Sequence, residues 1–159
     1  MKRIYHQFPL QPELERKYNF RADLPYIVRT IAAINGQFGT FVTDSPDLKG
    51  RPVQAKRSIT IEITDRTVNF LPLNEDTIES VLKDVKTEGT IDFRVTLKYS
   101  FLDDKFDRVP FKGDSFLVRI RLDTGILTMN VHHIDGMGRT DSGRIADTIV
   151  DQIIKNAPK

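Results

Sequence analysis

The sequence contains no cysteine among its 159 residues. Disulfide bonds, cysteine-ligated zinc or iron–sulfur clusters and thiol catalysis are therefore excluded. The chain also has little net charge, because 24 Lys and Arg residues face 22 Asp and Glu residues for a formal charge of +2. So balanced a charge gives no strong whole-molecule field to attract nucleic acid or anionic lipid. Any charged binding surface must be local.

Long apolar runs are missing as well. Residues 1–9, MKRIYHQFP, begin with basic residues but lack the apolar stretch of a signal peptide. No later segment approaches the roughly 20 apolar residues of a membrane-spanning helix. We therefore expect no membrane association and a cytoplasmic location.

The short motifs that mark common enzyme classes are absent too. The chain has no Gly-x-Ser-x-Gly elbow, no phosphate-loop lysine and no His-Glu-x-x-His pair. Nucleophilic catalysis has no visible support, and no cofactor is predicted.

What is present is the composition of a globular protein, with 39% apolar residues, 29% charged residues and ten Phe. A chain of this length buries roughly 70% of its unfolded surface, which is enough for a substantial core. We expect an N-terminal arm over residues 1–22, with a turn of helix at 12–18. A single α+β domain is predicted over residues 23–159.

Three segments have the apolar spacing of amphipathic helices, namely 24–35, 74–88 and 141–156. Asp23 is the predicted cap of the first and Gly36 follows its end, although Asn35-Gly36 leaves a β-hairpin as the alternative there. Asp141 or Ser142 caps the third helix. Its sheet-facing side is predicted to comprise Ile145, Ala146, Ile149, Val150, Ile153 and Ile154.

Strand patterns occur in six segments, namely 38–43, 58–63, 68–70, 91–101, 116–122 and 127–131. A two-residue turn at Thr124-Gly125 sets Leu122 against Leu127 and, further along, Phe116 against His133. The order of elements is helix, three strands, helix, three strands, helix. This order predicts an α+β fold, with an antiparallel sheet of about five to six strands and helices, including a C-terminal one, packed on one face.

Two of the three histidines, His132 and His133, lie in the string VHHIDG at 131–136. Successive side chains of a strand point to opposite faces, so both ligate one metal only if the strand ends or bulges there. The string resembles the first histidine motif of HNH nucleases, in which a strand, a loop and a helix hold a divalent ion and the histidine acts as general base. The resemblance implies a small metal-dependent hydrolase centred on His133 and Asp135. The later metal-site Asn and His of that family have no counterparts here, so the alternative is a strand-end histidine hydrogen-bonded near Asp135.

One face of the predicted sheet is polar and locally cationic. Its candidate partner-binding residues are Arg94, Lys98, Arg119, Arg121 and His132. The face lacks the aromatic residues on which RNA-binding sheets stack bases, so it suits phosphates or an acidic protein rather than sequence recognition. The alternative is an ordinary solvated face. In either case we expect Arg119 and Arg121 to be exposed and to contribute little to folding.

A glycine-rich connection follows the last predicted strand and leads into the C-terminal helix. Glycines let the backbone approach a ligand closely, arginines supply charge-assisted donors, and the helix start offers unpaired N–H groups. The candidate ligand-binding residues are Gly136, Gly138, Arg139, Ser142, Gly143 and Arg144. A simple tight connection is the alternative.

These features favour a non-enzymatic binding or interaction domain that engages an anionic ligand, a nucleic-acid backbone or an acidic protein. The alternatives are the metal-dependent hydrolase of His133 and Asp135 and a structural subunit of an assembly, including a homo-oligomer.

Overall fold

The computed structural model describes residues 3–44, 51–65 and 69–155. Its elements in chain order are β1 (Leu14–Asn19), α1 (Leu24–Ala32), β2 (Phe38–Asp44), β3 (Pro52–Thr64), β4 (Phe70–Pro72), α2 (Ile78–Leu82), β5 (Gly89–Leu102), β6 (Arg108–Asp123), β7 (Ile126–Asp135) and α3 (Ser142–Lys155). The expected strand residue Val68 and the expected last turn of the C-terminal helix at residue 156 lie outside the described residues.

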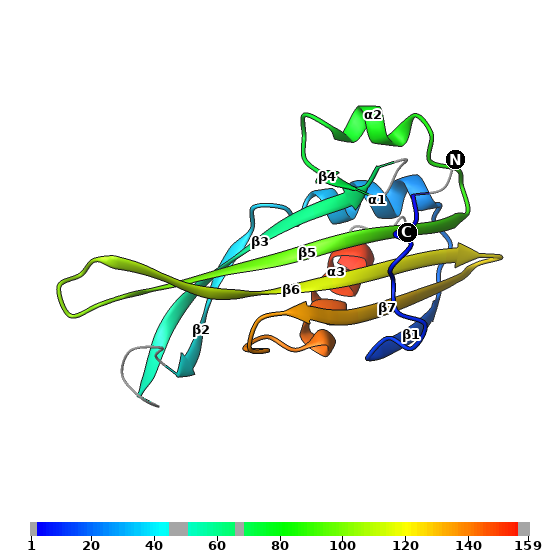
Figure 1. The fold of residues 1–159 in the computed structure, drawn as a ribbon. Coiled ribbons are helices and arrows are strands. Elements are labelled where there is room, and N and C mark those ends of the chain that lie inside the picture. Colours follow the sequence, from blue (N-terminus) through cyan, green and yellow to red (C-terminus); the bar gives the residue numbers. More distant parts are fainter. Residues whose placement is uncertain (1–2, 45–50, 66–68, 156–159) are drawn as a thin grey trace.

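The strands form one seven-stranded antiparallel sheet in the order β1-β7-β6-β5-β3-β2, with β4 pairing with β3 (Figure 1). The predicted hairpin register is confirmed, because Leu122 pairs with Leu127 and Phe116 pairs with His133. The antiparallel sheet and the C-terminal helix are confirmed as well. The sheet has one strand more than the upper estimate from the sequence.

That additional strand corrects the prediction for the N-terminal residues. The helical turn expected at 12–18 is wrong, since residues 14–19 form β1 and pair with β7. In β1 half-buried and exposed residues alternate, and Leu14 and Tyr18 pack against the core. Strand β1 is so short, and the residues before it are so irregular, that its period of two cannot be recognised in the sequence.

The middle helix is also shorter than predicted. Helix α2 covers only Ile78–Leu82 instead of residues 74–88. The Asn74 side chain accepts hydrogen bonds from the N–H groups of Asp76 and Thr77, which forms a turn where the first helical turn was expected.

The first helix, in contrast, is confirmed against the hairpin alternative. Asp23 Oδ1 accepts from Tyr26 N at 3.0 Å, and α1 ends before Gly36, whose φ of 85° suits glycine. Buried residues of all three helices share one core with residues of β3, β5, β6 and β7. Helix α3 contacts β7 and α1. Its predicted apolar side is right except for Ile154, which is 59% exposed because it points away from the core.

Residues 3–13 cross β5, β6 and β7 before the chain enters β1 (Figure 1). The backbone of Arg3 forms an isolated parallel β-bridge with Ile91, and the N–H of Tyr5 donates to the Asp92 carboxylate. Phe8 is buried against the Arg119 guanidinium, 4.4 Å from the ring centre. This N-terminal segment therefore covers part of the sheet.

The far ends of β2, β3, β5 and β6 extend away from the helices (Figure 1). Large apolar side chains remain exposed there, among them Leu102 at 50% and Phe106 at 83%. Among the described residues no helix is long and apolar enough to cross a membrane.

Candidate functional site

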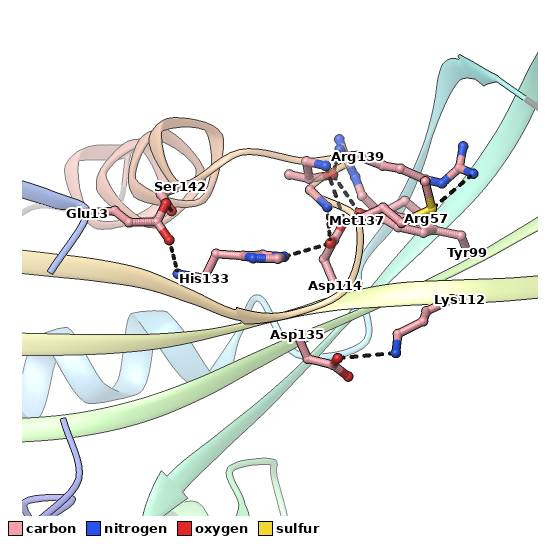
Figure 2. A network of polar contacts seen from close by, with 12 residues as sticks. Glu13, Arg57, Tyr99, Lys112, Asp114, His133, Asp135, Met137, Arg139 and Ser142 are labelled. Carbon is pink, nitrogen blue, oxygen red and sulfur yellow. Dashed lines mark hydrogen bonds and ion pairs between the residues drawn. The ribbon is translucent and has the colours of Figure 1, made fainter. Parts of the chain in front are cut away.

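A buried carboxylate, Asp114, organises the glycine-rich connection between β7 and α3 (Figure 2). Its two oxygens accept hydrogen bonds from Tyr99 Oη (2.5 Å), Gly138 N (2.7 Å) and Thr140 N (3.3 Å). Its Oδ1 lies 2.8 Å from His133 Nε2. The carboxylate thus joins β5, β6, β7 and the connection at one point.

The sequence pattern contains a signal for Asp114, which is not among the site residues predicted above. Asp114 has the same parity as Phe116 and Val118, so the period of two places its side chain on the buried face of β6. A bulge between Leu97 and Tyr99 lets the strand approach closely at Gly113, where an added Cβ would lie 1.8 Å from Leu97 O. A charged residue at a core position, next to a glycine within the same strand, therefore indicates a polar site inside the core.

The hydrogen bonds control the ionisation of this carboxyl group. Burial alone would raise the pKa of Asp114, but the donors Tyr99, His133, Gly138 and Thr140 outweigh it and hold that pKa below its usual value. Burial and the neighbouring Asp114 raise the pKa of the Tyr99 hydroxyl. Asp114 is therefore a stable anion and Tyr99 a neutral donor at neutral pH.

Gly136 makes the close approach of the connection possible. Its φ is 103°, and an added Cβ would lie 2.3 Å from both Asp114 Oδ1 and Gly113 O. No L-residue with a side chain fits that space without moving the backbone.

The structure separates the two residues of the hydrolase hypothesis. A bulge in β7 pairs Phe116 with His133 but Ser115 with Asp135, so residue 134 is extra and Asp135 turns to the other face of the sheet. There Asp135 forms an ion pair with Lys112, whereas His133 points inward to Asp114 (Figure 2). The described residues contain no group of three or more His, Cys, Asp or Glu that could hold a metal ion.

Most donors of the predicted ligand loop are engaged within the chain. Gly138 N binds Asp114, and Arg144 N binds Asp141 Oδ1 at 2.7 Å. Arg139 donates to Thr43 Oγ1 (2.9 Å) and packs on Phe111. Ser142 is buried and donates to Glu13 Oε2, and Gly143 is half-buried beside Arg16. The side chain of Arg144 is exposed and lines a cavity.

Glu13 is a second residue of the site for which the sequence contains no local signal. It lies just before β1 and accepts from the N–H of His133 at 3.0 Å as well as from Ser142. His132 Nδ1 lies 4.0 Å from Glu13 Oε1, and this buried atom has no hydrogen-bond partner in the described part of the chain. His132 is therefore half-buried beside Glu13, at the edge of the cationic face.

On that face, two of the four predicted cations are paired. Arg94 binds both oxygens of Glu62 at 2.9 Å, and Arg119 binds both oxygens of the fully buried Asp92 at 2.7 and 2.8 Å. Arg119 is half-buried under the N-terminal segment, so the expectation that it is exposed is wrong. The remaining pair, Lys98 and Arg121, is exposed as expected.

Lys98 belongs to a further surface at the projecting ends of the strands, which we call the distal face. The distal face consists of the same-side residues Phe38, Thr40, Val42, Asp44, Pro52, Gln54, Lys56, Ser58, Lys98, Ser100, Leu102, Arg108 and Pro110. A groove of about 550 Å³ crosses it, lined by Phe38, Thr40, Val53, Gln54, Ala55, Lys56, Leu102 and Arg108. Among the described residues no acidic side chain lines the groove, although Asp44 belongs to the same face.

Comparisons of this chain with protein-family models, curated proteins and solved structures found no significant match. Its function therefore has to be argued from the chemistry of its own surfaces.

Proposed function

We propose that this chain is a non-enzymatic binding domain whose distal face engages an acidic segment of a protein partner. The observation that carries the proposal is the groove, where the cations Lys56 and Arg108 stand beside the exposed side chains of Phe38 and Leu102. Neither cation forms an ion pair with a described residue, and the Lys56 ammonium lies 4.4 Å from the centre of the Phe38 ring. Unpaired cations beside apolar side chains favour a ligand that has both carboxylates and apolar groups.

The neighbouring strand edge favours an extended segment. Among the described strands β2 is the last of the sheet, so backbone groups on its outer side, apart from the Asp44 carbonyl that accepts from Arg139, can pair with an added strand. A peptide that adds to a sheet edge gains affinity from main-chain hydrogen bonds and specificity from alternate side chains. Alternating acidic and apolar residues fit the alternation of Phe38, Thr40 and Val42 along β2.

We further propose that the helices cover only one face of the sheet. On this view the opposite face is shared between the N-terminal segment, which covers Arg119, and a partner, which covers the distal face. A nucleic-acid backbone suits the distal face less well, because Val42 and Leu102 are aliphatic and neither stack on bases nor bind phosphate.

The test uses a synthetic ten-residue peptide of alternating Glu and Val, the same peptide with Lys in place of Glu, and single-stranded DNA. We expect saturable binding of the Glu-Val peptide alone, measured by fluorescence anisotropy. Lys56→Glu with Arg108→Glu should weaken binding by at least about 100-fold, since two favourable charge contacts become repulsive.

The matched control is Lys17→Glu with Arg21→Glu, which makes the same charge change on exposed residues outside the distal face. It should leave the affinity within about twofold, less than ~0.5 kcal/mol. Equal binding of both peptides, tighter binding of DNA, or equal losses in the two double variants would contradict the proposal.

A further inference from the structure

A second cavity lies between the β2–β3 pair and α3, on the other side of β2 from the distal face groove. It measures about 370 Å³, within the range of small-molecule sites. Three cationic side chains line it, Arg57 from β3 and Arg144 and Lys155 from α3. We call it the cationic cleft.

Arg57 stands on the buried face of its strand. It shares the parity of Ile59, Ile61 and Ile63, so the period of two directs its side chain toward α3 rather than to solvent. The half-buried guanidinium packs on the Phe41 ring at 4.9 Å and donates to Thr140 Oγ1 at 2.9 Å. Among the described residues no carboxylate forms an ion pair with it. A guanidinium has five N–H donors, so most of its capacity is unused.

The second arginine increases the local positive charge. Burial, followed by the charge of Arg144, lowers the pKa of Arg57, which indicates that the two guanidinium groups repel each other across the cleft. Arg144 likewise has no ion-pair partner among the described residues. Of the two carboxylates on the wall, Asp147 is bound by Arg16 and Asp151 remains. Cations therefore exceed available carboxylates inside the cleft.

A glycine leaves room for a ligand directly beside Arg57. Gly39 is the residue of β2 that pairs with Arg57, and an added Cβ there would meet no atom within 4 Å. The φ of Gly39 does not require glycine, and glycine in a strand interior is unfavourable without a reason such as close approach of a ligand. Ile59, which shares the parity of Arg57, adds apolar surface to the same cleft, whereas the Phe38 ring packs with Lys56 on the distal face.

We propose that the cationic cleft binds a small organic anion, with a carboxylate or phosphate group bridging Arg57 and Arg144 and an apolar body against Ile59. Arginine suits this role because its planar donor fork matches the oxygens of either group. The anion would relieve the repulsion between the two cations. This site is separate from the distal face, so either proposal stands without the other.

The experiment titrates the full chain with inorganic phosphate, phenyl phosphate and benzoate while following the amide resonances of Gly39 and Arg144. We expect saturable shifts, with phenyl phosphate or benzoate bound at least several-fold more tightly than inorganic phosphate because the ring covers apolar surface. The tighter of the two identifies phosphate or carboxylate as the preferred group.

Two variants test the geometry by different means. Arg144→Gln should weaken binding of the preferred probe about tenfold, the effect of one lost charge-assisted contact. Gly39→Leu fills the space beside Arg57 without changing any charge, and it should abolish the shifts. Arg21→Gln, on an exposed residue outside the cleft, is the charge control, and Lys56→Glu with Arg108→Glu should leave cleft binding intact.

The proposal is overturned if no probe gives saturable shifts. It is also overturned if Gly39→Leu, shown to be folded by its spectrum, binds as well as the original chain, or if Arg21→Gln weakens binding as much as Arg144→Gln does. Binding of inorganic phosphate as tight as that of both ring compounds would overturn the apolar part of the site.

Discussion

Asp114 shows at the residue scale how one buried charge fixes the path of a loop. Its carboxylate accepts from Tyr99, from His133 and from two backbone N–H groups of the connection to α3. Hydrogen bonds to a charged group contribute about 1.5–3 kcal/mol each, more than bonds between neutral groups. The start of α3, and with it Arg144 in the cationic cleft, is therefore positioned by this one residue.

Asp114→Asn should destabilise the fold by about 2–4 kcal/mol, because the neutral amide accepts more weakly and presents its own N–H₂ group to the surrounding donors. Urea denaturation at neutral pH measures the loss. Asp135→Asn is the matched control, since Asp135 is exposed and its ion pair with Lys112 is exposed too. A loss for Asp114→Asn no larger than for Asp135→Asn would show that the network does not stabilise the fold.

The same carboxylate predicts a pH dependence. The pKa of Asp114 is lower in the folded chain than the value of about 3.9 expected for an unfolded aspartate. Its contribution is therefore complete above that unfolded pKa and is lost as the pH falls through the folded pKa. In Asp114→Asn the unfolding free energy should decline less steeply on acidification below about pH 4. Parallel acid profiles for the two chains would contradict this.

At the scale of elements, the N-terminal segment changes the roles of residues on the strands beneath it. Asp92 is fully buried although it lies on the face of β5 that the alternation assigns to solvent. The segment supplies Tyr5 N to this carboxylate and places Phe8 over Arg119. A salt bridge that would be weak in water is thereby partly removed from solvent, and breaking it leaves a buried charge.

Arg119 and Arg121 on β6 provide a matched pair for this effect. Arg119→Ala should cost about 3–5 kcal/mol, because Asp92 loses its cation while remaining buried. Arg121→Ala should stay within about 0.5 kcal/mol, since its side chain is exposed and makes no ion pair with a described residue. Thermal or urea unfolding of the two single variants distinguishes them. Similar small losses of unfolding free energy at both positions would mean that the N-terminal segment does not shield the Arg119–Asp92 ion pair from water in solution.

At the scale of the whole molecule, the sheet has a packed half and a projecting half. Phe93 and Phe116 are at most 1% exposed in the core, whereas Phe38 and Leu102 are 70% and 50% exposed on the distal face. The packed half buries the apolar surface that stabilises the fold. The projecting half leaves apolar and cationic groups available, and both proposed binding surfaces include residues of β2 and β3.

This division predicts a gradient of amide hydrogen exchange. Amides of β5 and β6 around Phe93 and Phe116 should exchange last, at rates near those of global unfolding, because these strands are paired on both sides and buried. Amides of the distal ends, such as those near Leu102 and Arg108, should exchange earlier through local opening. Uniform protection along both strands, measured by NMR, would contradict the division. Addition of the Glu-Val peptide should slow exchange at the distal ends.

Local patterns were sufficient for much of the secondary structure. The alternation along residues 91–101 and 116–131 predicted two strands and a hairpin register, since a shift of one residue would have turned every apolar side chain of the hairpin to solvent. A cap at Asp23 and the spacing of isoleucines predicted α1 and α3. The length of helix α2 was overestimated, because the apolar spacing typical of a helix continues through flanking residues that form turns in the fold.

The sequence by itself determined the antiparallel sheet, the C-terminal helix and the buried face of the strands, because apolar periodicity and turn chemistry act between neighbouring residues. Only the tertiary structure decided which polar residues meet. It paired Arg119 with Asp92 and separated His133 from Asp135 by a one-residue bulge. It also brought Arg57 and Arg144, which are far apart in the sequence, to the same cleft. Such contacts depend on strand order, bulges and the route of the N-terminal segment, which are set by packing of the whole chain and leave no local period to read.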